Sequence, residues 1–199
     1  MSDKKKTILT ISGSPHRDGT SSKMLQCFTE LLEDFSVEHS FLLRRYDAFE
    51  CGFAPCIDCR ACRTFEGCVN PDMDEFYRDF ETADGIVIAT PIYNLSFPAP
   101  LKAILDRTQR YYNARFSLGK RPPIAKHRPA ALLMTAGDPN EDGAIAAQQL
   151  RRSFTVTNCT LVCYTICAGT DRFGGVEFPT RGVHDELDRC VKEFGAELL

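Results

Sequence analysis

The chain has 199 residues, of which 43% are hydrophobic and 26% charged, and its formal net charge is -3. These values are typical of a single globular domain covering residues 1–199, and they argue against a nucleic-acid surface. No apolar run is long enough to span a membrane and no signal peptide is recognisable. We therefore expect a cytoplasmic protein whose ten cysteines are reduced thiols or ligands.

Apolar runs and helical patterns alternate along the whole chain, which is typical of an α/β protein. In chain order we expect a strand at Thr7–Ser12, a helix at Thr20–Phe35, a strand at Val37–Leu43, a helix at Met73–Thr82, a strand at Gly85–Thr90, a helix at Pro100–Tyr112, a strand at Ala130–Thr135, a helix at Gly143–Asn158, a strand at Leu161–Ala168 and a helix at Val183–Leu199. This pattern predicts a flavodoxin-like, doubly wound, five-stranded parallel sheet in the order 2-1-3-4-5, with helices on both faces.

The first predicted strand leads into a loop crowded with hydroxyl side chains, immediately before the first helix. A helix N-terminus offers unpaired N–H groups and a favourable dipole to a phosphate. The loop is neither a Walker A nor a G-x-G-x-x-G sequence. One N-capping hydroxyl would be expected in any such protein, but five hydroxyls favour a phosphate site. The candidate ligands are Ser12, Ser14, Thr20, Ser21 and Ser22, while His16 and Arg17 either add charge or are merely solvated.

A cysteine-rich loop at about 51–70 follows the second strand and carries a C-x2-C-x2-C-x5-C pattern. Its members are Cys56, Cys59, Cys62 and Cys68. Thiolates select zinc, Cu(I) or iron–sulfur iron, and repeated C-x-x-C steps can turn successive sulfurs toward one centre. A redox-active dithiol and a purely structural role are the alternatives.

Two later loops follow the third and fourth strands. The carboxyl ends of parallel strands share one edge of a sheet, so these loops should meet the phosphate loop there. The first mixes aromatic, amide and proline groups that suit a planar heteroaromatic ring, at Pro91, Ile92, Tyr93, Asn94, Leu95 and Ser96. The second contains Thr135, Ala136 and Gly137, where glycine permits close approach of a ligand. Both could instead be plain turns. The polar segment 113–128 between them is predicted to be an exposed arm.

Together these motifs resemble the NADPH-dependent FMN reductase family of flavodoxin-like proteins, and in particular its iron–sulfur flavoprotein branch. The resemblance is carried by the Gly13–Ser21 loop, by Pro91–Tyr93 leading into Leu101–Arg107, and by the cysteine block followed by Asp72-Met73. It departs from the family at His16, where an Arg is usual, and at Thr20-Ser21, where Asn-Thr is usual.

The resemblance implies FMN, with its phosphate at Ser14 and Thr20–Ser22 and its isoalloxazine ring on Pro91–Ser96 near Thr135–Gly137. It also implies a [4Fe-4S] cluster on the four cysteines of the pattern, and a homodimer or a dimer of dimers. Tyr93 is the candidate catalytic residue, stacking on the ring or gating substrate, while backbone N–H groups of Asn94–Ser96 would stabilise the reduced ring.

The sequence therefore predicts an FMN-dependent NAD(P)H oxidoreductase that passes electrons from a nicotinamide to a small-molecule or protein acceptor, with or without a cluster. Two alternatives share the flavin. One is a non-enzymatic, flavodoxin-type electron carrier, and the other is a flavoprotein whose cysteines sense zinc or oxidants.

Overall fold

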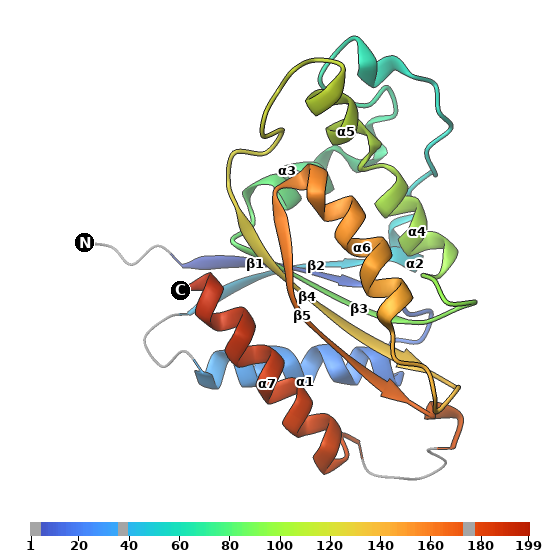
Figure 1. Ribbon diagram of the computed structural model, residues 1–199, viewed down its shortest axis with the longest axis vertical. Helices are drawn as coiled ribbons and strands as arrows, with labels where there is room; N and C mark the ends of the chain where they lie inside the picture. The colour runs from blue at the N-terminus through green and yellow to red at the C-terminus, as the bar shows by residue number, and fades with distance from the viewer. Residues whose placement is uncertain (1–4, 36–39, 173–177) are drawn as a thin grey trace.

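A computed structural model describes residues 5–35, 40–172 and 178–199. In this part of the chain five strands form one sheet, and all neighbouring strands run parallel (Figure 1). The strands are β1 (Lys6–Ser12), β2 (Phe41–Asp47), β3 (Gly85–Pro91), β4 (Arg128–Ala136) and β5 (Cys159–Ala168). Their order is β2-β1-β3-β4-β5. The predicted fold class and strand order are confirmed.

Helices cover both faces of this sheet (Figure 1). One face is covered by α1 (Thr20–Phe35) and α7 (Arg181–Leu198). The other carries α3 (Asp74–Thr82), α4 (Ala99–Asp106), α5 (Gln109–Phe116) and α6 (Ala144–Thr157), and a short helix, α2 (Ala48–Cys51), follows β2. Successive side chains of a strand point to opposite faces, so Ile86 and Ile88 join the core beneath α3–α6, while Val87 joins the core beneath α1 and α7.

Two element boundaries differ from the prediction. Strand β2 runs from Phe41 to Asp47, whereas Val37–Leu43 was expected, and residues 37–39 lie outside the described chain. Because β2 is an edge strand with solvent beside it, Arg44 and Arg45 fit within it. The predicted helix Pro100–Tyr112 is divided into α4 and α5. At the division the backbone N–H groups of Thr108, Arg110 and Tyr111 donate to carbonyls three residues back instead of four, and the Thr108 hydroxyl also donates to the Leu105 carbonyl at 2.7 Å.

The segment expected to be an exposed arm, 113–128, is exposed over most of its length, at 116–122 and 125–127, but not throughout. Asn113 is buried in α5, and Ile124 is buried as well. Arg128 is fully buried at the start of β4, where its guanidinium donates to the carbonyls of Phe80 and Thr157. The two polar residues that are buried have partners inside the protein, since Arg128 binds backbone carbonyls and the Asn113 amide contacts the Cys62 sulfur and the Ser117 hydroxyl. Within the described ranges, no helix combines the length and apolarity needed to cross a bilayer.

Candidate functional site

A pocket of about 310 Å³ lies at the carboxyl ends of β1, β3, β4 and β5. It is lined by residues from each of the three predicted loops and from one further loop. The lining residues are Ser14, His16, Gly19, Thr20, Ser21, Pro91, Ile92, Tyr93, Thr135, Ala136, Gly137, Thr170 and Asp171. The parallel topology thus brings together segments that are far apart in the sequence, as expected for a doubly wound sheet.

The β1–α1 loop is held in shape by its own hydrogen bonds. The Ser14 hydroxyl accepts from the His16 backbone N–H at 3.2 Å, and the His16 carbonyl accepts from the Gly19 N–H at 3.2 Å. Helix α1 begins at Thr20 with no acidic residue in its first turn, so its positive end meets the pocket without an opposing carboxylate of its own. This end of the pocket suits an anion.

Ser21 links the phosphate loop to β4. Its buried hydroxyl lies 2.8 Å from the hydroxyl of Thr135, so one hydrogen bond ties the first turn of α1 to the end of the fourth strand. Two of the three predicted loops are therefore fixed relative to one another by residues that themselves line the pocket.

Three predicted phosphate ligands point elsewhere. Ser12, Arg17 and Ser22 line a separate groove between α1 and β2. Arg17 is exposed and forms an ion pair with Glu50, and the Ser22 hydroxyl donates to the His16 carbonyl at 3.0 Å. Ser12 ends strand β1 and Ser22 lies in helix α1, where successive side chains point in different directions, so only part of the hydroxyl-rich run can face one ligand. His16, by contrast, does line the pocket.

The second predicted loop forms a two-residue turn. Tyr93 and Ser96 exchange backbone hydrogen bonds of 2.9 and 3.0 Å, and Asn94 and Leu95 between them have φ values of 52° and 61°. Both φ values are left-handed, as a type I′ turn requires. The Ser96 N–H is thus engaged within the turn, so in this structure it is not free to donate to a flavin ring as expected. Asn94, Leu95 and Ser96 are not among the lining residues, whereas the half-exposed Tyr93 is.

Thr170 and Asp171 complete the pocket, although the sequence did not single them out. The Thr170 hydroxyl donates to the Ala136 carbonyl at 3.1 Å. A Cβ placed on Gly137 would lie only 2.4 Å from Asp171 Oδ2, so the glycine makes room for this carboxylate. The same rule that selected the other loops would have found them, since they follow the carboxyl end of β5.

The four cysteines of the C-x2-C-x2-C-x5-C pattern line one cavity of about 90 Å³ between their loop and α4–α5. Cys56 and Cys59 are exposed, and Cys62 and Cys68 are half-buried. Cys51 does not line this cavity. All ten cysteines are free thiols, and those on β5 and α7 are buried.

Arg107 closes the base of the cysteine loop. Its guanidinium donates to the Ala54 and Asn70 carbonyls, both at 2.9 Å, and pairs with Asp72 at 2.8 Å. Asp72 in turn accepts from the Ala54 N–H at 2.7 Å. Burial disfavours the charged guanidinium, but the hydrogen bond to Asp72 and the contributions of Tyr77 and Cys68 together outweigh this and raise the pKa of Arg107 above its ordinary value. A permanent cation therefore lies at the cavity wall.

Four thiols around one cavity are a donor set that fits an iron–sulfur cluster or a thiophilic metal ion. Within the described residues, no three Cys, His, Asp or Glu side chains already converge closely enough to hold one metal ion. Arg107 Nε is buried without a hydrogen-bond partner and belongs to a residue lining the same cavity, which suits an anionic occupant.

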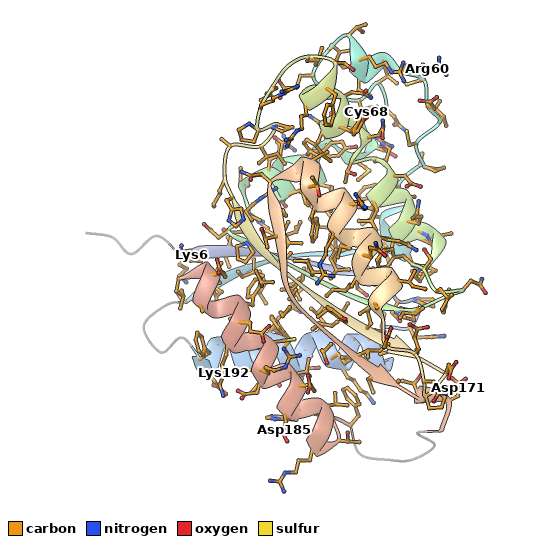
Figure 2. The ribbon with its side chains drawn as sticks, viewed as in Figure 1. Lys6, Arg60, Cys68, Asp171, Asp185 and Lys192 are labelled. Carbon is orange, nitrogen blue, oxygen red and sulfur yellow. The ribbon has the colours of Figure 1, made fainter. Side chains whose placement is uncertain are left out.

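The two sites are separate within one chain. They share no lining residue, and Figure 2 shows Cys68 and Asp171 well apart along the long axis of the molecule. Each site is therefore built independently, the first by the carboxyl edge of the sheet and the second by a loop packed on α4 and α5.

A parallel sheet in this order, with a multi-loop pocket at its carboxyl edge, defines a flavodoxin-like protein. Residues 7–169 match the NADPH-dependent FMN reductase family, and the chain belongs to that family. The resemblance to this family and to its iron–sulfur flavoproteins is confirmed.

Two curated relatives and one solved structure illustrate the match. The chain is 33% identical to an iron–sulfur flavoprotein of Methanosarcina thermophila, over 67% of this chain and 64% of that protein. It is 29% identical to one of Methanocaldococcus jannaschii, over 75% of this chain and 71% of that protein. An NAD(P)H:quinone oxidoreductase from Methanothermobacter marburgensis superposes with a TM-score of 0.65 at 20% identity, over 98% of this chain and all (100%) of that one, which supports the fold.

Proposed function

We propose that the protein is an FMN-dependent NAD(P)H oxidoreductase that passes electrons to a small-molecule or protein acceptor. The observation that carries this proposal is the pocket in which the N-terminus of α1 and its hydroxyls meet the Tyr93 loop and Thr135–Gly137. Membership of the NADPH-dependent FMN reductase family supports it.

The residues divide into two groups by their chemistry. Ser14, Thr20 and Ser21 offer hydroxyls beside the positive end of α1 and would hold the phosphate. Pro91–Tyr93 and Thr135–Gly137 offer an apolar wall and backbone groups, and would hold the ring. Bound FMN would supply the redox chemistry. Tyr93 is half-exposed at the pocket and is placed to cover a bound ring or limit access to it.

The test is anaerobic mixing of FMN-loaded protein with NADPH, and separately with NADH, while flavin absorbance is followed. We expect FMN to bind with one site per chain and to be bleached rapidly by one or both nicotinamides. Binding of FMN with only slow bleaching would instead identify a flavodoxin-type carrier. Failure to bind FMN would overturn both.

We further propose that Cys56, Cys59, Cys62 and Cys68 hold a [4Fe-4S] cluster. Their shared cavity, the cationic Arg107 at its wall and the names of the curated relatives support this. Such a cluster would supply one-electron transfer. The residues of the chain would contribute the ligands and a loop whose two ends are clamped together.

Replacing Cys59 with serine is expected to remove most iron and acid-labile sulfide from anaerobically purified protein, because an alkoxide is a much poorer ligand for cluster iron than a thiolate. FMN content should be unchanged, since the two sites share no residue. The control is Cys51→Ser, which alters a thiol outside the cavity and should leave iron and sulfide at the wild-type level.

Zinc without sulfide in the wild-type protein would contradict the cluster and favour the zinc alternative. Equal iron and sulfide in the wild type and in Cys59→Ser would show that this cysteine is not a ligand.

We also propose that the chain assembles as a homodimer or a dimer of dimers. Tyr112 and Phe116 of α5 are exposed, with ring centroids 4.6 Å apart, and Leu118 is exposed just beyond them. Sedimentation velocity of the FMN-loaded protein tests this proposal, and a monomer at micromolar concentration would contradict it.

A further inference from the structure

Asn113 places an amide group against one of the four cavity cysteines. It lies on α5, far in sequence from the cysteine loop, and is 4% exposed. Its Nδ2 lies 3.1 Å from the sulfur of Cys62. In the part of the chain that the structure describes, Cys56, Cys59 and Cys68 have no comparable side-chain hydrogen bond. The surroundings of the four thiols are therefore unequal.

The orientation of this amide is set by its neighbour one helical turn along. The Ser117 hydroxyl donates to Asn113 Oδ1 at 3.3 Å, and the Ser117 N–H donates to the Asn113 carbonyl at 2.8 Å. With the amide oxygen engaged on that side, the NH2 group is directed at the sulfur. The donor is thus positioned by the fold before any ligand arrives.

A buried amide needs a good acceptor, because burying a polar group without a partner costs free energy. A neutral thiol is a weak acceptor, whereas a thiolate accepts a charge-assisted hydrogen bond of about twice the strength. The position of Asn113 is therefore better satisfied when Cys62 is a thiolate, which is the form that ligates iron.

We propose that Asn113 is a positioning residue that donates an N–H···S hydrogen bond to the Cys62 thiolate and raises the reduction potential of the cluster bound there. This rests on the proposed cluster. Reduction adds negative charge to the centre and its sulfurs, so a donor hydrogen bond stabilises the reduced form more than the oxidised form. Arg107 and Arg110 line the same cavity and add a positive field, but in the described chain neither donates a hydrogen bond to a cysteine sulfur.

The test is an anaerobic redox titration of the FMN-loaded, cluster-loaded protein, with the reduced cluster followed by electron paramagnetic resonance. Asn113→Leu keeps the side-chain size and removes the donor. At a fixed solution potential we expect its ratio of reduced to oxidised cluster to fall about tenfold, which is about 59 mV for a one-electron couple. Thr155→Ala, at an exposed position of α6 outside the cavity, is the control, and its cluster should keep the wild-type reduction potential.

A second variant covers the case in which leucine prevents cluster assembly. Ser117→Ala leaves Asn113 in place and removes only the hydroxyl that orients it, at an exposed position where folding should tolerate the change. We expect Ser117→Ala to lower the reduction potential of the cluster as well, by less than Asn113→Leu does. Iron and sulfide are measured on every sample before titration.

The outcomes separate this inference from the proposed function. Wild-type protein without iron and sulfide would overturn the cluster and this inference with it. Fully loaded Asn113→Leu and Ser117→Ala proteins with the wild-type potential would overturn the role of Asn113 alone. If Asn113→Leu cannot be loaded, an unshifted Ser117→Ala protein is sufficient to overturn it.

Discussion

Replacing Gly13 with valine is expected to weaken FMN binding by at least about tenfold and to lower the free energy of unfolding by about 1–3 kcal/mol or more, the range seen for overpacked cores. Gly13 joins β1 to the phosphate loop, and its N–H donates to the Ala89 carbonyl at 2.7 Å. A Cβ there would lie 2.6 Å from Leu101 Cδ2 and 2.7 Å from Thr90 Oγ1. Both neighbours are fully buried, so the loop must shift instead.

The measurements are flavin fluorescence titration for affinity and urea unfolding for stability. Gly182→Ala is the matched control, because a Cβ at that helical glycine meets nothing within 4 Å. It should leave FMN affinity unchanged. Wild-type affinity in Gly13→Val would mean that the β1–α1 loop does not hold the flavin phosphate.

Replacing Arg107 with methionine is expected to lower the free energy of unfolding by about 3 kcal/mol, and to expose the loop between Ala54 and Asn70 to proteases. The substitution leaves two carbonyls and the Asp72 carboxylate without their partner. Removing one member of a buried ion pair costs about 3–5 kcal/mol, and the lower figure applies because Asp72 keeps some solvent contact.

Urea unfolding and limited proteolysis measure the two effects. Arg110→Met is the control from the same cavity. Arg110 is 3.6 Å from Glu81 and stacks over the Tyr77 ring at 4.2 Å, but it does not bind the loop ends. Losing Arg110 should lower the free energy of unfolding by less than losing Arg107 does, and should leave the cysteine loop resistant to proteases. Equal protease sensitivity in both variants would show that general destabilisation, and not loss of the clamp, opens the loop.

The sequence was sufficient for the fold because the buried strands are continuous apolar runs, as in Gly85–Thr90, separated by amphipathic helices. It was not sufficient for the division between α4 and α5. Helical spacing continues through Leu105 to Tyr111, yet the backbone bonds there run to carbonyls three residues back, beside Arg107, whose partners are distant in sequence. The spacing of hydrophobic residues reflects a local preference for helix, whereas the point where a helix ends depends also on tertiary contacts.

For the pocket, the rule that strand carboxyl ends share an edge selected the correct loops, but composition could not say which side each residue faces. Ser12 and Ser22 turn toward the groove beside β2, although they flank residues that line the pocket. The cysteine spacing found one cavity, yet Asn113 reaches it from another helix. The direction of a side chain and its partners from distant segments follow from the folded backbone, and the residue type alone does not give them.

Arg107 binds both ends of the cysteine loop, so the segment between Ala54 and Asn70 begins and ends at one clamp. Its other side-chain contacts with the domain, in the described chain, include those of Cys62 with Asn113 and of Glu66 with Lys120. The free energy of closing a flexible loop changes by only about 0.6 kcal/mol for each doubling of its length. Insertions, deletions or exchanged ligand patterns in this segment would therefore leave the sheet and its pocket largely unaffected. If the loop holds the proposed cluster, we expect that grafting it with its Arg107–Asp72 base onto a related scaffold would transfer the metal centre with it.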